Sequence, residues 1–458
     1  MSTRQSRDDE ETTVGVLSLH NSKETKAILN AVDDMGYGTA WLRAENLAVE
    51  VEGGEMRLEP DVDVVVNRLL LSKEEFPTEL LGLGATVERL APTLNRPPAT
   101  LTALHKFASA AALSEAGLPV PDALLALSRD RLEAGRDRFG PEFVYKTAIG
   151  THGGGTWKLG QEDVLNPRVG NRQAFLQQYL EHDAERHSDL RVYVVGGEVV
   201  GAMRRLAPED EWRTNVALGG NVEDAGDALT DEVADIAVRA ADVIGLDYAG
   251  VDLVEDERGW YILEVNPTAG FKGLFEATGR SPAPHIAQLA LDCAGVTVDD
   301  EVVRRLETTL DDSRPACAPR VEAAEPTEPA VIGYIEEVDV IGTSGRKTVM
   351  AKSDTGATRT SIDARLAADI GTGPIKDIVK IKSGSLKSGT SRPVVDVVVG
   401  VGGTQHTVSA SVEDRSHMDY PMLLGRDILE HYRVDVRRRA DTDRGEASEE
   451  EEEEDAEE

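Results

Sequence analysis

Three oxygen-bearing side chains lie on two apolar stretches near the middle of the chain. Asp252 lies in GVDLV, and Glu264 and Asn266 lie in LEVNP. Glu264 and Asn266 are two residues apart, so they share one face if this stretch is a β-strand. Carboxylate and amide oxygens suit Mg2+, which proteins often share with nucleotide phosphates. We therefore expect a magnesium site here; the alternative is a pair of solvated strand ends.

Phosphate-binding chemistry is indicated upstream, where Lys146 ends an apolar stretch and GTHGGG follows at 150–155. Glycines allow backbone N–H groups to approach phosphates closely, and a nearby lysine supplies a compact positive charge. A flexible turn would show the same glycines, so this motif has meaning only together with the others.

Arginines are concentrated in one short part of the chain: Arg191, Arg204, Arg205 and Arg213, with Asn215 close to the last. The planar guanidinium presents a fork of N–H donors that matches carboxylates and phosphates. We expect these arginines to line a pocket for anions. The alternative is that they balance the charge of neighbouring carboxylates.

The order of these pieces resembles the ATP-grasp superfamily, and within it the RimK-type ligases that add L-glutamate to a ribosomal protein or to cofactor tails. The resemblance covers roughly residues 13–300. It rests on Lys106, Lys146, GTHGGG, QQYL, DLRVYVVGGEVVGAMRR, WRTN, AGVDL and LEVN.

The resemblance implies an ATP site whose residues contact the phosphates, the adenine or the ribose: Lys106, Lys146, Gly150, Gly153, Gly154, Gly155, Gln178, Tyr179, Leu180, Asp189, Arg213 and Asn215. Within this set, residues 178–180 would form the hinge at the adenine edge, and Asp189 would lie near the ribose. Arg213 and Asn215 would hold the γ-phosphate or an acyl phosphate. Two ions of Mg2+, or of Mn2+ in its place, would bind Asp252, Glu264 and Asn266.

The implied reaction joins a carboxylate to an amine. ATP would phosphorylate an acceptor carboxylate, and the amine of glutamate would then attack the acyl phosphate and release phosphate. We expect Arg191 and Arg205 to hold substrate carboxylates. The partners implied are glutamate and an acceptor, either a protein C-terminus or a poly-glutamyl tail.

The chain departs from the family pattern at two places, of which the first should be tolerated in adenine recognition and the second, a loop near the substrate, leaves the acceptor open. Gln178 stands where the family usually has glutamate, and Asn266 is followed by Pro267-Thr268-Ala269-Gly270 instead of a loop ending in Pro-Gly. One alternative acceptor is a deazaflavin or pterin cofactor tail or an amino-acid biosynthesis carrier. Another class of function is a peptidase with a regulatory nucleotide-binding region.

A second chemical motif, AKSDTGATRTS, lies at 351–361, and YPMLLGRDIL follows at 420–429. The pair resembles retroviral-type aspartic proteases, and more closely a small domain named for an ATP-dependent zinc protease that accompanies glutamate ligases. Asp354 would be catalytic, but one motif supplies one aspartate, so a two-aspartate site requires a dimer. The alternative is a degenerate barrel for assembly or docking. His406, His417 and His431 lack the spacing of zinc ligands.

The elements that must position these residues alternate along the chain. The pattern predicts a capped helix at 22–37, one helix from about residue 100 that Gly117 ends, and two hairpins with turns at Gly196-Gly197 and near Glu257–Gly259. The pattern and the resemblance predict an α/β ATP-grasp fold, with a pre-ATP-grasp parallel sheet and two α+β subdomains, followed by an all-β retropepsin-like barrel. The expected segments are a disordered 1–12, a pre-ATP-grasp domain 13–95, a ligase domain 96–300, a linker 301–330, a barrel 331–439 and a disordered acidic tail 440–458.

Composition excludes some classes of function. The formal charge is −35, and the ten acidic residues of the last thirteen account for only part of it. Few lysines and an acidic surface fit a protein of concentrated salt and disfavour nucleic acid as a partner. The chain shows no run of about 18 apolar residues and no apolar leader, so we expect no membrane partner and a cytoplasmic location.

Overall fold

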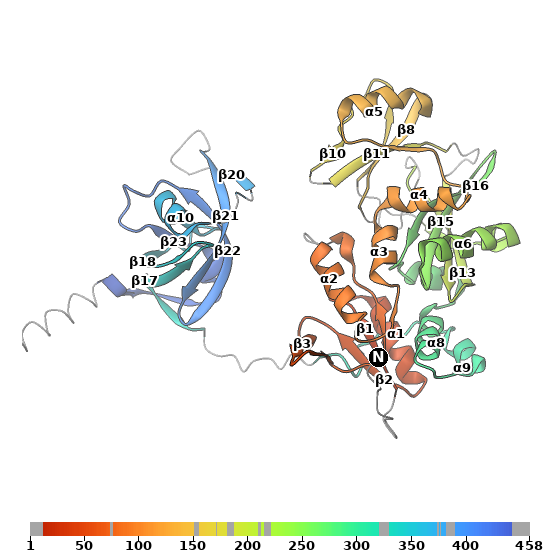
Figure 1. Cartoon of the computed structure of the whole chain (residues 1–458), viewed down its shortest axis with the longest axis horizontal. Coiled ribbons are helices and arrows are strands. Elements are labelled where there is room, and N and C mark those ends of the chain that lie inside the picture. The colour runs from red at the N-terminus through yellow and green to blue at the C-terminus, as the bar shows by residue number, and fades with distance from the viewer. Residues whose placement is uncertain are drawn as a thin grey trace, which may run out of the picture. The chain divides into compact units, whose positions relative to one another are not determined.

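The computed structural model describes residues 12–441, except for 74–76, 151–154, 171, 181–186, 209–211, 215–220, 320–328, 373–374, 376 and 382–389. The chain divides into two compact units, Met1–Arg320 and Val321–Glu458 (Figure 1). The disorder expected of residues 1–12 and 440–458 falls almost entirely outside the described residues; residues 12, 440 and 441 of these segments are described.

The first sheet of unit 1 is parallel, with the order β2-β1-β5-β6. Its strands are β1 (Thr13–Leu17), β2 (Gly38–Leu42), β5 (Val64–Asn67) and β6 (Thr93–Leu94). Helix α1 (Lys23–Asp34) connects β1 to β2 and begins at Ser22, whose side chain accepts a hydrogen bond from the backbone N–H of Thr25. This N-cap satisfies one of the otherwise unpaired donors of the first turn, as the sequence predicted.

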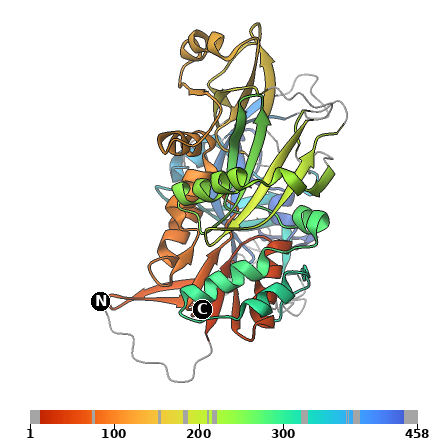
Figure 2. The same cartoon turned by 90° about the vertical axis from the view of Figure 1, so that its right-hand side faces the viewer.

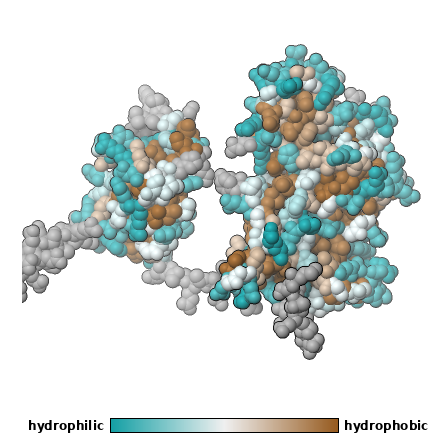
Figure 3. All heavy atoms as spheres, viewed as in Figure 1, coloured by the Kyte–Doolittle hydropathy of each residue, from teal (hydrophilic) through white to brown (hydrophobic). Residues whose placement is uncertain are grey.

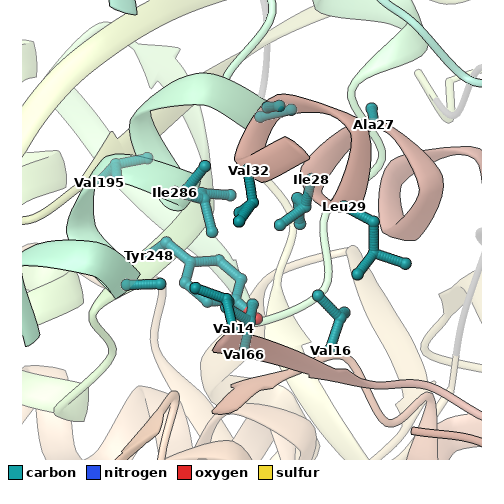
Figure 4. Packing of buried hydrophobic residues seen from close by; sticks show 14 of the residues in the cluster. Val14, Val16, Ala27, Ile28, Leu29, Val32, Val66, Val195, Tyr248 and Ile286 are labelled. Carbon is teal, nitrogen blue, oxygen red and sulfur yellow. The ribbon is translucent and has the colours of Figure 1, made fainter. Parts of the chain in front are cut away.

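Helix α1 covers one face of this sheet. Ile28, Leu29 and Val32 of the helix pack toward Val14 and Val66 of the strands in a common apolar cluster (Figure 4). The other elements of this region are the hairpin β3 (Ala48–Glu52) and β4 (Glu55–Glu59), which the sequence did not predict, a 3-10 turn at Leu71–Lys73, and α2 (Pro77–Val87).

Residues 97–115 form two helices where the sequence pattern predicted one. Helix α3 (Pro97–Leu104) ends at His105, which has an extended backbone, and α4 (Lys106–Glu115) begins directly after it. The ring nitrogen of His105 accepts a hydrogen bond from the N–H of Ala108, so a histidine acts as the N-cap. The break places Lys106 on the first turn of a new helix.

The second sheet of unit 1 has the order β10-β11-β8-β9, with β7 on the other edge of β11. It lies at the top of Figures 1 and 2. Its strands are β7 (Ala123–Leu125), β8 (Glu142–Thr147), β9 (Thr156–Gly160), β10 (Arg168–Val169) and β11 (Arg172–Gln178). Helix α5 (Arg129–Gly135) and a 3-10 turn at Arg136–Phe139 accompany it.

The third sheet has the order β14-β13-β12-β15-β16. Its strands are β12 (Ser188–Val195), β13 (Glu198–Leu206), β14 (Asn221–Asp224), β15 (Tyr248–Asp256) and β16 (Gly259–Asn266). Both hairpins predicted from the sequence are present. Gly196 and Gly197 have φ of 59° and 81° at the first turn, a conformation that favours glycine. Helix α6 (Asp231–Ile244) packs on this sheet with its apolar face, and a 3-10 turn at Gly226–Ala228 precedes it.

The end of unit 1 differs from the predicted linker. Helices α7 (Lys272–Thr278) and α8 (Ala283–Cys293) are followed by α9 (Asp300–Leu306), where the linker was expected to begin. The segment after α9 contacts the first helix, because the Asn30 side chain donates hydrogen bonds to the carbonyls of Asp311 and Ser313. Polar Pro-rich composition alone could not reveal these tertiary contacts.

Unit 2 contains a closed barrel of β17, β18, β23, β19, β22 and β21, because β21 also pairs with β17. The bounds are β17 (Val331–Ile341), β18 (Arg346–Ser353), β19 (Ser361–Asp363), β21 (Thr390–Val401), β22 (Thr404–Glu413) and β23 (Met422–Leu424). Strands β20 (Asp377–Ile381) and β24 (Arg433–Arg439) extend it, with helices α10 (Ala364–Ile370) and α11 (Arg426–Leu429). Valine and isoleucine side chains fill the interior.

Hydrophilic residues cover much of the visible face of each unit, with hydrophobic residues in smaller patches between them (Figure 3). Across the described residues, no helix is both long and apolar enough to cross a membrane.

Candidate active site

A cavity of about 150 Å3 lies between the second and third sheets of unit 1. Its walls come from α4, β8, β9, β11, β12, β13, β15 and β16 and from the segments after β11 and before β14. Most of the described residues that the sequence assigned to nucleotide, metal and substrate line it together: Lys106, Lys146, Gln178, Tyr179, Leu180, Asp189, Arg205, Arg213, Asp252 and Glu264.

The predicted metal ligands share one side of the β15–β16 hairpin. Asp252 is directly opposite Glu264, and Asn266 is opposite Gly250. Directly opposed residues of an antiparallel pair project to the same face, so the three side chains converge as predicted. The Asn266 amide nitrogen lies 3.5 Å from Oδ2 of Asp252.

Protein cations already contact these carboxylates. Arg191 donates from Nε and Nη2 to the two oxygens of Asp252, at 2.6 and 2.7 Å. Arg205 adds a bond of 2.8 Å to Oδ2 of the same carboxylate. Burial alone would raise the pKa of Asp252, but the charges and hydrogen bonds of the two arginines outweigh it and bring the pKa to about 2. Asp252 is therefore ionised in any physiological buffer.

Arg205 also forms a fork with Asp189, with both bonds at 2.6 Å. The Thr214 hydroxyl donates to the same carboxylate. Arg205 is only 4% exposed, and Asp189 6%. The structure thus gives Asp189 an arginine and a threonine as partners, while its contact with a ribose stays a prediction. The role of Thr214 was missed, although it lies inside the WRTN motif.

Two lysines interact with Glu264 of the β15–β16 hairpin. Lys106 donates from Nζ to Oε2 of Glu264 at 2.8 Å, and its backbone N–H binds the carbonyl of Ala148 at 2.8 Å. Burial and the positive charge of Lys106 together lower the pKa of Lys146 to about 7, although the negative charge of Glu264 opposes both effects. A bound phosphate favours the charged form of a lysine, so phosphate binding should raise the pKa of Lys146.

Aromatic side chains surround the predicted hinge. Lys158 Nζ lies 4.5 Å from the ring centroid of Tyr179, and Trp212 meets Tyr179 edge to face at 5.9 Å. The backbone N–H of Gln178 binds the carbonyl of Asp122 at 2.8 Å, which attaches the hinge to the start of β7. Sequence reasoning missed Lys158, which lies in a strand without a recognisable motif, and it assigned no role to Trp212, although Trp212 begins the WRTN motif.

The glycine-rich loop connects β8 to β9. Gly155 has φ of 77°, and a Cβ there would lie 2.6 Å from Oγ1 of Thr147. Only glycine suits this position without strain. Gly150 is buried at the start of the loop. Gly153, Gly154 and Asn215 lie outside the described residues, so their predicted roles have no structural test.

The oxygen donors fit a divalent cation of the magnesium type. Asp252 and Glu264 provide two carboxylates, and Asn266 provides an amide oxygen on the same face. Within the described ranges, no group of three or more His, Cys, Asp or Glu side chains forms a metal cluster. The remaining ligands would therefore be the amide oxygen of Asn266, water and phosphate oxygens. Mg2+ in proteins is usually bound in this way, by one or two carboxylates together with water and phosphate.

Unit 2 places Asp354 immediately after β18. Its backbone N–H binds the carbonyl of Leu424 at 3.0 Å, and its Oδ1 accepts from the N–H of Gly356 at 2.9 Å. Nearby, Asp427 accepts from the N–H of Thr360 and, at 2.8 Å, from its hydroxyl. The DTGA and GRD motifs, 70 residues apart in sequence, are thus joined by hydrogen bonds.

Comparison with known families gives two matches. The RimK-like ATP-grasp domain matches residues 103–289, and the retropepsin-like aspartic endopeptidase RimB matches residues 369–444. The second match begins after Asp354.

Individual relatives point to the same group. A protein named probable alpha-L-glutamate ligase from Mannheimia succiniciproducens is 30% identical over 254 residues, covering 53% of this chain and 81% of the relative. The tetrahydromethanopterin:alpha-L-glutamate ligase of Methanocaldococcus jannaschii is 34% identical over 191 residues. That match covers 40% of this chain and 64% of the relative, so the chain spans less than two thirds of that relative's length.

Among solved structures, a RimK domain ATP-grasp protein from Sphaerobacter thermophilus is 18% identical, with a TM-score of 0.45. That match covers 61% of this chain and all of the other.

Proposed function

Because this chain belongs to the RimK-like ATP-grasp family of alpha-L-glutamate ligases, we propose that it is an ATP-dependent ligase that joins the amine of L-glutamate to an acceptor carboxylate. The observation that carries this proposal is a cavity in which buried Lys146 and half-buried Lys106 lie beside the carboxylates of Asp252 and Glu264. A structural ion-pair network would not need a lysine held near neutrality beside another lysine.

Nucleotide phosphates would bind between the lysines and the hairpin. Lys106 and Lys146 would donate to phosphate oxygens, and Arg213 lines the same cavity from the loop before β14. In phosphoryl transfer the protein mainly positions the reacting groups and stabilises negative charge. Cationic side chains held in fixed positions around the phosphates would do both. Residues 178–180 would contact the adenine at the far end of the cavity.

Mg2+, when bound by Asp252, Glu264 and Asn266, would neutralise charge on the transferring phosphoryl group. We propose two ions, shared between these residues and the phosphates. Lys106 is placed to exchange Glu264 for a phosphate as the nucleotide enters, because its Nζ contacts both the carboxylate and the cavity.

The proposed reaction has two steps. The acceptor carboxylate attacks the γ-phosphorus, which forms an acyl phosphate and releases ADP. The glutamate amine then attacks the acyl carbon. The bond from this carbon to the phosphate oxygen breaks, which releases phosphate, and the amine proton passes to solvent. Positive charge around the acyl phosphate favours both steps.

The contacts of the two arginines refine their expected roles. Arg205 is fully enclosed by Asp189 and Asp252, so we assign it to positioning these carboxylates. The side chain of Arg191 is 16% exposed and donates two hydrogen bonds to Asp252. Arg191 thus stays the candidate of the two for contact with a substrate carboxylate.

Two classes of acceptor remain as proposals, a protein C-terminus or poly-glutamyl tail, and a small cofactor tail. The relative from Methanocaldococcus jannaschii is named for tetrahydromethanopterin, which favours keeping the cofactor class. ADP release in concentrated salt, measured with L-glutamate and each acceptor class in turn, distinguishes them. ADP release at the same rate with and without L-glutamate would contradict the ligase proposal.

For unit 2 we propose an aspartic-type peptidase whose site forms from two copies. The support is Asp354 at a tight turn fixed by the GRD segment of the same barrel. Cleavage of poly-glutamate peptides that rises with the square of protein concentration in the dilute range would support a dimeric site. First-order dependence on protein would argue for a monomeric one.

A further inference from the structure

Arg68 is a buried cation that contacts Tyr248 and Phe271 but has unused donors on two of its three nitrogens. It follows strand β5 directly and is only 6% exposed. Its Nε and Nη1 atoms are inaccessible to solvent and have no hydrogen-bond partner among the described residues. A buried guanidinium without a counter-charge is costly, so a partner from outside the protein is expected.

The position of Arg68 is one where α/β sheets bind ligands. The chain leaves β1 toward β2 on one side, and leaves β5 toward β6 on the other. The strand order therefore reverses between β1 and β5, and ligands of such sheets bind beyond the carboxyl ends of the strands at this switch point. Arg68 lies at the carboxyl end of β5, where its N–H binds the carbonyl of Leu17 at the end of β1.

The loop 267–271 connects this position to the hairpin of the active site. The loop follows Asn266, and the guanidinium of Arg68 lies 5.4 Å from the ring centroid of Phe271 at its other end. Between them, a Cβ on Gly250 would lie 2.5 Å from Cβ of Ala269 and 3.5 Å from Cδ of Arg191. Arg191 and Ala269 of the loop therefore both lie against Gly250, on the strand that carries Asp252.

Other groups of the first sheet hold the same loop. The N–H of Phe271 donates to Glu24 on the first turn of α1 at 3.3 Å, and the Asn95 amide donates to the carbonyl of Pro267 at 3.0 Å. The loop is thus attached at both ends to the sheet that carries Arg68. A shift of this loop would open Arg68 and the hairpin together.

We propose that Arg68 binds a carboxylate of the incoming amino acid at the carboxyl ends of β1 and β5, beside the loop 267–271. This inference rests on the proposed ligase function. The donors are reached only when the loop shifts, and an enclosed site of this kind admits a small amino acid more readily than a protein terminus. An arginine here selects for an acidic substrate through charge-assisted hydrogen bonds.

The test compares Arg68→Met and Arg68→Lys with the control Arg43→Met. Arg43 also lies over an aromatic ring of the same sheet, 4.7 Å from the centroid of Trp41, but it has Glu45 as a carboxylate partner. Thermal unfolding is followed with and without L-glutamate, in the presence of ADP and Mg2+. We expect glutamate to raise the unfolding temperature of wild type and Arg43→Met, with the shift lost in Arg68→Met and partly kept in Arg68→Lys.

Without ligand, Arg68→Met should unfold at the wild-type temperature or higher, since it removes an unpaired buried charge. Marked loss of stability together with a retained glutamate shift would overturn the proposal, because Arg68 would then have a structural role only. In steady-state assays, Arg68→Met should raise KM for glutamate at least about tenfold, with KM for ATP unchanged. A rise in KM for the acceptor instead would contradict the assignment to the amino acid.

The two readouts separate this inference from the ligase proposal. If wild type shows no ligase activity but still gains a glutamate-dependent shift that Arg68→Met abolishes, the carboxylate site stands and the reaction is wrong. If wild type has ligase activity, and Arg68→Met keeps both the glutamate-dependent shift in unfolding temperature and the wild-type KM for glutamate, the ligase proposal is supported. The proposed carboxylate site at Arg68 is then wrong.

Discussion

Arg191 and Asp252 face one another on neighbouring strands β12 and β15 and are joined by two hydrogen bonds of 2.6 and 2.7 Å. Arg205 binds the same carboxylate from β13. The proposed metal ligand is therefore neutralised by protein cations before any nucleotide is bound. Metal and phosphate would bind as a pair, because the phosphates give the displaced cations a new partner.

The first prediction concerns the stability of this network. Arg191→Met removes one partner of a buried pair and should lower the free energy of unfolding by about 3 kcal/mol at neutral pH. The double variant with Asp252→Asn should cost less than the sum of the single changes, which denaturant unfolding of all three proteins can measure. Additive effects would show that the pair contributes no coupling.

The pH dependence of stability follows from the same carboxylate. The folded-state pKa of Asp252, about 2, is below its ordinary value of 3.8, so the stabilising contribution is present above pH 3.8. It is lost as pH falls toward 2. Arg191→Met should reduce this acid-dependent loss, measured as the difference in unfolding free energy between neutral pH and the acid range.

The second prediction tests the magnesium assignment. Glu264→Gln keeps the size of the side chain but removes the charge that a divalent cation requires, so Mg2+-dependent ADP formation should fall by at least about 100-fold. Glu255→Gln is the matched control, because Glu255 is an exposed glutamate on the adjoining strand of the same hairpin. Equal activity of the two variants would refute Glu264 as a metal ligand.

The third prediction concerns the proton on Lys146. With a pKa of about 7, this lysine is mostly neutral at pH 8 in the free protein, and bound phosphates should favour its charged form. ADP binding at pH 8 should therefore take up close to one proton, visible as a dependence of the calorimetric enthalpy on buffer ionisation. Uptake should decline as the pH falls through 7 and should be small at pH 6, where Lys146 is already mostly charged in the free protein.

Lys146→Met serves as the comparison for that experiment, because it removes the titrating group. Its ADP affinity should be weaker than wild type and nearly independent of pH between 6 and 8. Proton uptake that persists in Lys146→Met would assign the titration to a different residue.

The fourth prediction separates the two units. Asp354→Asn should abolish any cleavage of poly-glutamate peptides and leave ATP-dependent ligation unchanged, since each activity depends on residues of one unit. Thr360→Val should lower the stability of unit 2, because it removes a hydroxyl that donates to Asp427 and accepts from the N–H of Gly425. Cleavage by Asp354→Asn at the wild-type rate would exclude an aspartic mechanism.

The parts of this fold that the sequence predicted are those with a strong local signal. Ser22 before an apolar helical pattern indicated α1, and the Gly196-Gly197 turn indicated the β12–β13 hairpin. Two-residue spacing placed Glu264 and Asn266 on one face. In each case the determinant lies within a few residues in sequence, so no tertiary information was needed.

Other features depend on contacts that a sequence pattern does not contain. The break at His105 occurs in a stretch with good helix-forming residues on both sides, and tertiary contacts of Lys106 with Ala148 and Glu264 accompany it. The pairing of Arg205 with Asp189 was hidden because either residue alone fits a ligand contact. The positive charge of Arg68 was visible in the sequence, but its burial and the unused donors on Nε and Nη1 were not.

The most direct test of the central claim is mass spectrometry of candidate acceptors after incubation with the protein, ATP, Mg2+ and L-glutamate in concentrated salt. The account predicts an acceptor that gains the mass of one or more glutamate residues, with one ADP formed for each residue added and no gain with Glu264→Gln. ADP formation without glutamate, and no mass gain on protein termini, poly-glutamyl peptides or cofactor tails, would contradict it.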